Sequence, residues 1–178
     1  MRLSLVSVGD QKAALKKLAE LAERSTLHPR IREAAGAITN DLRARDDAGE
    51  LEAIFNAVKH GSSKVPGLKN GFRYVADPRL ADLFIAPFRA LEMCQRGSCG
   101  SDCDDHAALV TSLAGSLGFR MGLRAWGPEN TDEFVHVYAV AALPKRNPKQ
   151  VVGLDTTVPE SFVGWEPPRG HVLTAWLE

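Results

Sequence analysis

The sequence lacks several features that would place it in a specialised class of protein. It has no run of about 18 apolar residues, so no membrane-spanning helix is expected. Its 22 basic and 22 acidic residues cancel, so no basic surface points to nucleic acid and no acidic excess points to disorder. With 44% hydrophobic and 25% charged residues among 178, the composition is that of an ordinary globular protein with a sizeable core.

Cysteine is also scarce, and its three positions lie close together. Cys94, Cys99 and Cys103 are odd in number, which argues against a disulfide framework, and a bond between Cys94 and Cys99 is not indicated. Their spacing matches none of the usual paired zinc ligands, so we expect no metal site, and a zinc-binding module is only a third alternative. The first ten residues show no signal-peptide core, so we expect a cytoplasmic protein, or one that is packaged into a virion.

The first third of the chain carries helical patterns. Apolar residues recur at helical spacing, with charged residues opposite, over 10–24, 29–45 and 50–60. The pattern favours a layer of helices packed on the core, and the alternative is that helix 10–24 docks a partner protein. Residues 1–8 are expected to form a short strand or arm. A further helix is predicted from Asp77-Pro78, interrupted at Pro87.

A buried helix is predicted to begin at Cys103. The apolar stripe consists of Cys103, Ala107, Val110, Ala114 and Leu117, which share one face of a helix. Gly118 follows, where a left-handed residue would end the helix. Cys103 therefore belongs to the first turn, with Ser101 or Asp102 as N-cap.

A cysteine at a helix start has chemical consequences. The unpaired N–H groups and the positive end of the helix favour the thiolate, which is the nucleophilic form. The neighbouring carboxylates of Asp102, Asp104 and Asp105 oppose this by like-charge repulsion, so the arrangement calls for a histidine from elsewhere in the chain. His136 is the candidate for that histidine, and Asp155 is the candidate for the third residue of the same set. His106 would lie at the same end of the helix, as a surface or supporting residue.

After Gly118 the period changes from 3.6 to 2. Strands are predicted over 120–126, 134–140 and 151–154, and a last strand near the C-terminus. His136 lies within the second of these strands, and Asp155 directly follows the third. Helices followed by an antiparallel sheet indicate an α+β fold.

Four segments in this order resemble the transglutaminase-like cysteine peptidase superfamily, and most of all its bacteriophage and prophage branch. They are RYVADPRLADLFIAPFRALE, DCDDHAALVTSLAGSLGF, FVHVYAV and VVGLDTT. The resemblance covers roughly residues 28–168. It implies a papain/transglutaminase-like α+β fold, with the catalytic helix packed on an antiparallel sheet. Residues 28–178 would form this domain, and residues 1–27 a helical extension.

The resemblance also agrees with the order of a Cys–His–Asp triad. Cys103 would be the nucleophile, His136 the base and Asp155 the group that orients it. Cys99 competes for the first role, but Cys103 fits the helical register better. The remaining candidates, for the oxyanion hole or for substrate contacts, are Gln95, Asp102, Trp126 and Trp165.

We therefore expect a cysteine-dependent acyl-transfer enzyme. It would hydrolyse or transamidate a peptide or isopeptide bond through a thioester on Cys103. No cofactor is implied. The expected partners are a peptide or protein substrate and other virion or prophage proteins, with neither nucleic acid nor membrane. The alternative is a catalytically silent structural or assembly protein of a phage or prophage particle that keeps the fold.

Overall fold

The computed structural model describes residues 8–76 and 84–178, and within them helices pack on an antiparallel sheet. The α+β class is therefore confirmed. The predictions for residues 1–7 and for the helix start at Asp77-Pro78 lie outside the described residues. The elements are α1 (Val8–Thr26), α2 (Pro29–Thr39), α3 (Asp47–Lys59), β1 (Arg73–Tyr74), α4 (Pro87–Gln95), β2 (Gly100–Ser101), α5 (Cys103–Ser116), β3 (Arg120–Pro128), β4 (His136–Leu143), β5 (Gln150–Leu154) and β6 (Gly170–Trp176).

Helix α5 is the centre of the molecule. Every residue from Cys103 to Ala114 is buried, because α1, α2, α3 and α4 surround the helix and the sheet closes its remaining side. The helix ends as predicted, since Gly118 adopts a left-handed φ of 89° just after the C-cap Leu117. A helix that is buried on all sides needs such a setting, in which its polar side chains also find partners.

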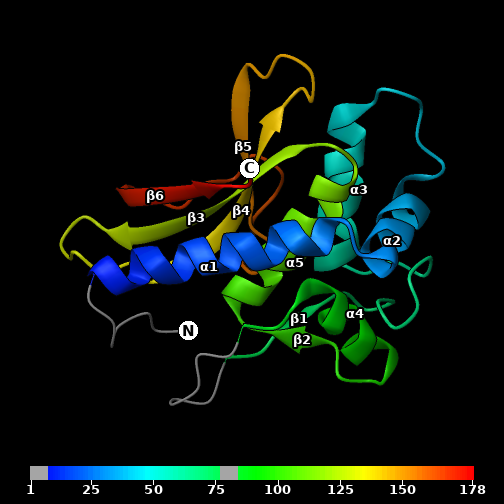
Figure 1. Cartoon of the computed structure of the whole chain (residues 1–178), viewed down its shortest axis with the longest axis horizontal. Helices are drawn as coiled ribbons and strands as arrows, with labels where there is room; N and C mark the ends of the chain where they lie inside the picture. The colour runs from blue at the N-terminus through cyan, green and yellow to red at the C-terminus, as the bar shows by residue number, and fades with distance from the viewer. Residues whose placement is uncertain (1–7, 77–83) are drawn as a thin grey trace.

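The main sheet has the order β5-β4-β3-β6, with every neighbouring pair antiparallel. β3, β4 and β5 follow one another as hairpins, and β6 returns to the free edge of β3 (Figure 1). The β3–β4 ladder ends with the pair Trp126 and His136. Helix α5, the candidate for the catalytic helix, packs on β4 and β3, as expected.

Helix α1 lies across α5 and contacts β3 and β6 (Figure 1). Its buried side chains form a second apolar cluster with α5, β3 and the segment before β4, separate from the core that α2, α3 and α4 share. The predicted packing layer of helices is thus present. The division of the chain at residue 27 stays a prediction. Helix α2 is shorter than predicted, since it ends at Thr39 with Asn40 as its C-cap, and Asp46 then caps α3.

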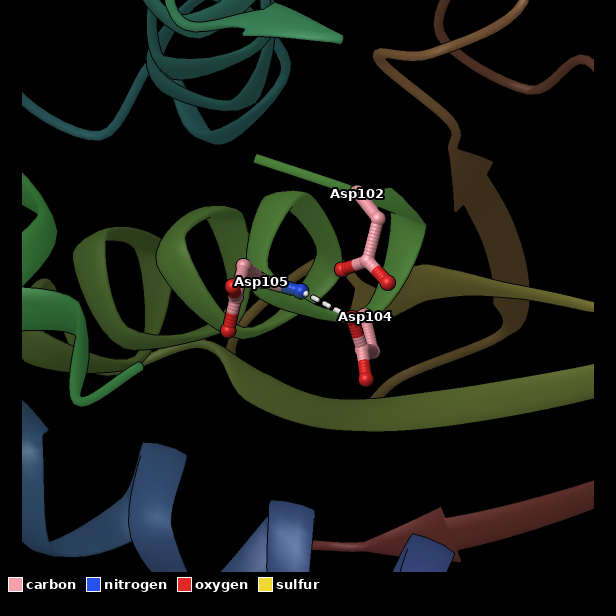
Figure 2. Close-up of side chains that lie close together, drawn as sticks. All are labelled: Asp102, Asp104 and Asp105. Atoms are coloured by element: carbon pink, nitrogen blue, oxygen red, sulfur yellow. Dashed lines mark hydrogen bonds between the residues drawn. The ribbon is translucent and has the colours of Figure 1, made fainter. Parts of the chain in front are cut away.

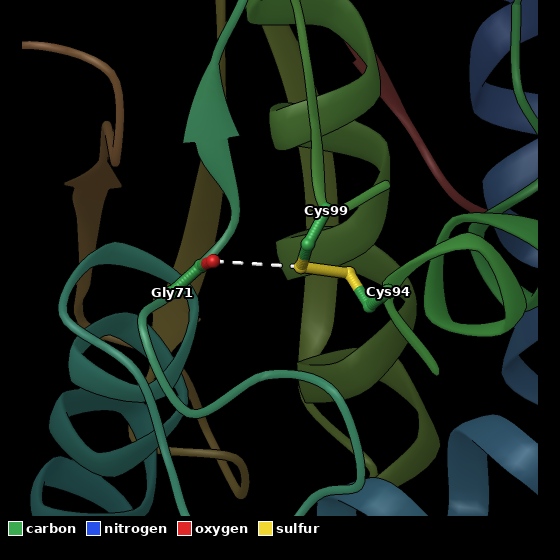
Figure 3. The surroundings of a disulfide bond; sticks show 3 residues. All are labelled: Gly71, Cys94 and Cys99. Atoms are coloured by element: carbon green, nitrogen blue, oxygen red, sulfur yellow. Dashed lines mark hydrogen bonds between the residues drawn. A yellow bond between two sulfur atoms is a disulfide. The ribbon is translucent and has the colours of Figure 1, made fainter. Parts of the chain in front are cut away.

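A disulfide bond joins Cys94 to Cys99, a pairing that the sequence leaves open but does not indicate, and Cys103 is a free thiol (Figure 3). An odd number of cysteines excludes the pairing of all three but still allows one disulfide bond. Gly97, with a φ of 91°, reverses the chain after α4, and the Ser98 N–H donates to the Met93 carbonyl at 2.9 Å. The turn brings the two cysteines together, and it leads into a short parallel pairing of β2 with β1 that the sequence did not indicate.

In the described part of the chain, helices that combine the length and the apolar character needed to cross a bilayer are absent.

The disulfide predicts how many thiols can be labelled. Protein unfolded in denaturant without a reductant should take up one iodoacetamide group, because only Cys103 carries a thiol. After reduction it should take up three. Intact-mass spectrometry counts the labels, and three labels before reduction would show that the bond is not formed.

Candidate active site

The first turn of α5 holds Cys103 in a fixed place. The preceding β2 residues pair with β1, so the chain enters the helix from an anchored strand. Ser101 Oγ donates to Asp105 Oδ2 at 2.5 Å, and Asp105 Oδ1 accepts from the Ile85 N–H at 2.7 Å. Cys103 itself is 5% exposed. The sulfur is therefore presented by a rigid helix start, as the sequence predicts.

His136 and Asp155 meet between two neighbouring strands. His136 opens β4, and Asp155 directly follows the end of β5 at Leu154. Because these strands pair antiparallel, the end of β5 returns to the beginning of β4. The His136 ring donates from Nε2 to Asp155 Oδ2 at 2.6 Å.

Asp155 is also held from its other side. Its Oδ1 accepts from the Thr157 N–H at 2.9 Å and from the Thr157 hydroxyl at 2.7 Å, the pattern of an Asx turn. The side chain is 1% exposed. One oxygen of this carboxylate therefore caps a turn, and the other pairs with His136.

Cys103 and His136 line the same small apolar cavity, so the sulfur and the imidazole lie in one place in the fold. Since Nε2 of His136 faces Asp155, Nδ1 is the ring nitrogen that remains for the sulfur. The cavity measures about 10 Å³, room for one water molecule. The structure thus brings the three predicted triad residues together in one place.

The electrostatics of His136 and Asp155 favour their charged forms. Burial by itself would lower the pKa of His136, but hydrogen bonds to Asp155 and Cys103 and the charges of both raise it to about 9. Burial would raise the pKa of Asp155, but the hydrogen bond and charge of His136, with the bonds from Thr157, hold it below its usual value.

Three carboxylates crowd the same helix start. Asp102, Asp104 and Asp105 are buried, and one oxygen of each lies within 4.8 Å of the others (Figure 2). Burial, a hydrogen bond with Asp102 and the negative charges nearby raise the pKa of Asp104 to about 10, so this carboxyl holds a proton at neutral pH. Oxygen ligands suit hard cations such as Mg²⁺ and Ca²⁺, and these three residues could hold one. The cysteines do not offer a zinc site, because two of them are bonded to each other.

The other predicted site residues lie apart from this cavity or at its margin. Gln95, at the exposed end of α4, accepts from Arg30 at 2.7 Å and does not line the cavity. Asp102 is the N-cap residue of α5. Trp126 is paired with His136 in the sheet and donates from Nε1 to the Pro168 carbonyl at 2.9 Å.

Trp165 lies in the segment after β5, where its carbonyl approaches Gly153. It is not among the residues that line the cavity beside Cys103. The structure therefore does not bring Gln95 or Trp165 into contact with the triad, and the role assigned to each stays a prediction.

Two further residues support the site: His106, which sequence analysis placed at this end of the helix as a surface or supporting residue, and Lys59, which it missed. His106 is 1% exposed rather than at the surface, and its Nδ1 lies 3.0 Å from the Thr156 hydroxyl, next to Asp155. Burial outweighs the effects of the Arg73 backbone and nearby acidic groups, and lowers the pKa of His106 to about 4. Its position three residues after Cys103 was the available signal.

Lys59, at the end of α3, is the second. Its Nζ donates to the Val158 carbonyl at 2.8 Å, to the Ser161 carbonyl at 2.6 Å and to the Ser161 hydroxyl at 2.7 Å. It thereby anchors the segment that follows Asp155. A lysine at the end of an amphipathic helix usually faces solvent, so the sequence carried no signal for this role.

Comparisons with known proteins add a likeness in fold. No protein-family model matches the chain, and no curated protein sequence does. The structure is similar to two solved structures of Legionella pneumophila LapG, one of them calcium-bound. Each is 18% identical to this chain in sequence, with a TM-score of 0.45, and the match covers 84% of this chain and 75% of the LapG chain. The roles considered below rest on the geometry of this chain.

The charged pair predicts a pH dependence of stability. The raised pKa of His136 gives a contribution that is complete below about 6.5 and is lost as pH rises through about 9. The lowered pKa of Asp155 gives a contribution present above about 3.8 and lost at still lower pH. The free energy of unfolding of wild type should therefore exceed that of His136→Ala, and this difference should be largest between about pH 3.8 and 6.5. The difference should shrink as pH rises from 6.5 to 9.

Urea denaturation at each pH measures this difference. Asp104 also makes stability fall with rising pH, but it is present in both proteins and cancels. A difference that stays constant between pH 5.5 and 9.5 would contradict the charged pair.

Proposed function

We propose that this protein is a cysteine-dependent acyl-transfer enzyme that acts on a peptide or isopeptide bond. The observation that carries the proposal is the position of His136, which is hydrogen-bonded to Asp155 at 2.6 Å and lines one cavity together with Cys103. Nucleophilic catalysis requires this combination of a sulfur, an imidazole and a group that orients the imidazole.

The reaction follows from the geometry. The thiolate of Cys103 attacks the carbonyl carbon, and the backbone N–H at the start of α5 is free of intrahelical bonds and faces the developing oxyanion. The carbon–nitrogen bond breaks, and the leaving amine takes the proton that His136 holds. Water then attacks the thioester and gives its proton to His136, and the carbon–sulfur bond breaks. A lysine amine in place of water would make a cross-link instead.

The order of the three residues along the chain, on a helix start, a strand and the next strand end, supports the transglutaminase-like assignment made from the sequence. A protein substrate fits this chemistry. The phage or prophage setting remains a prediction from the sequence resemblance alone.

The second candidate is a catalytically silent assembly protein with the same fold. The 5% exposure of Cys103 favours it, because a substrate must reach the sulfur for any reaction to occur. The two candidates differ in how Cys103 should behave toward a small reagent, and in whether any bond is cut.

The reactivity of Cys103 tests the His136 pairing. In the folded, unreduced protein at pH 7, His136→Ala should slow alkylation of Cys103 by iodoacetamide by about tenfold or more, because the thiolate loses its cationic partner. Stopped aliquots analysed by mass spectrometry give the rate. His60→Ala, which removes an exposed histidine at the end of α3, is the matched control and should leave the rate unchanged. Equal rates in wild type and His136→Ala would favour the assembly protein.

The bond that is cut can be found directly. Peptides and bacterial cell-wall fragments are incubated with wild type and with Cys103→Ser, and the products are identified by mass spectrometry. Wild type should yield hydrolysis or transamidation products that the variant does not, because serine in place of the sulfur forms no thioester. Hydroxylamine should intercept the thioester as a hydroxamate. Identical product lists from the two proteins would exclude catalysis on these substrates by Cys103.

A further inference from the structure

Helix α1 contributes to the wall of the candidate active site. The cavity that Cys103 and His136 line is closed on another side by α1, through Gln11, Ala14 and Leu15. This helix lies before the segment that resembles the cysteine peptidases, so the resemblance gives it no role. Its contact with the site is a feature of the fold of this chain.

Gln11 is a polar residue in the apolar stripe of α1. It lies one helical turn before Leu15, which belongs to the buried cluster, and it is only 2% exposed. A buried amide without hydrogen bonds destabilises a protein by about 1–3 kcal/mol, so its presence calls for specific partners. A leucine at this position would complete the stripe at no such cost.

The side chain of Gln11 is hydrogen-bonded to both backbone groups of one residue, Phe134. Gln11 Oε1 accepts from the Phe134 N–H at 3.2 Å, and Gln11 Nε2 donates to the Phe134 carbonyl at 3.4 Å. The amide thus offers Phe134 the acceptor and donor that a neighbouring strand would offer. The two residues are 123 positions apart in the chain.

Phe134 needs such a partner because it precedes His136, the first residue of β4 that is paired with β3. The last pair of the β3–β4 ladder is Trp126 with His136, and the Val135 N–H still donates to the Trp126 carbonyl at 2.9 Å. Phe134 lies outside that pairing and is buried, so its backbone groups cannot turn to water. Gln11 therefore fixes the chain two residues before His136.

We propose that Gln11 is a positioning residue for His136, and that α1 is a working part of the active site. By fixing Phe134 it sets the direction in which β4 begins, and so the place of the His136 ring between Asp155 and Cys103. The proposal rests on the proposed function, since it assigns a role in the Cys103–His136 chemistry.

Gln11→Met tests the proposal, because methionine keeps the length of the side chain and removes both hydrogen bonds. We expect alkylation of Cys103 at pH 7 to slow by about tenfold, toward the rate of His136→Ala, as the imidazole leaves its place beside the thiolate. We also expect the low-field NMR signal of the proton between His136 and Asp155, assigned by its loss in His136→Ala, to shift or broaden.

Ser112→Ala is the matched control. It removes a different buried hydrogen bond of α1, which Ser112 Oγ of α5 donates to the Ala22 carbonyl at 2.9 Å, near the opposite end of α1. It should lower Tm to a similar extent as Gln11→Met, yet leave both the alkylation rate and the low-field signal unchanged. A general loosening of α1 would affect both variants alike.

Each outcome decides. The positioning role is overturned if Gln11→Met leaves the alkylation rate and the low-field signal unchanged, as Ser112→Ala should. It is also overturned if Cys103 is alkylated faster in Gln11→Met than in wild type, because α1 would then only cover the sulfur. Should Gln11→Met fail to fold, amide hydrogen exchange in wild type decides instead, since the proposal requires a protected Phe134 N–H. If His136→Ala does not slow the alkylation of Cys103, the proposed function itself is refuted, which is a separate result.

Discussion

The hydrogen bond between His136 and Asp155 is the interaction on which the site depends. A carboxylate that is 1% exposed is stable only with full compensation, and His136 and Thr157 provide it. With one ring nitrogen committed to Asp155, the orientation of the imidazole is settled and the other nitrogen is left for Cys103. Only 19 residues separate His136 from Asp155, and the β4–β5 hairpin that links them brings the two side chains together.

The position of Cys103 relative to this pair requires more of the fold. Helix α5 carries the sulfur, and contacts from several elements hold the helix start against the strands. His106 connects the first turn of α5 to Thr156, and Lys59 connects α3 to the segment after it. Each of these contacts is buried or half-buried and hydrogen-bonded to backbone or hydroxyl groups. Precise geometry at a catalytic centre is typically achieved through such a supporting layer.

Sequence analysis identified the elements whose pattern has one interpretation. The stripe from Cys103 to Leu117, the strand around His136 and the Asp after β5 follow from periodicity, and their order along the chain suggested that they meet. The Cys94–Cys99 bond depends on a local chain reversal that an odd cysteine count conceals. Gln95 was chosen by its nearness to Cys103 in sequence, but α4 directs it toward Arg30. Contacts between distant segments, such as that of Gln11 with Phe134, leave no trace in local pattern.

The order of the strands in space has a consequence for the folding of the protein. The central strand β3 obtains its second neighbour from β6, which lies far from it in the sequence, and α1 must close on the segment before β4. Contacts of such long sequence separation carry a large entropic cost of loop closure and slow the folding of a domain. We therefore expect the surroundings of Cys103 to be completed late in folding.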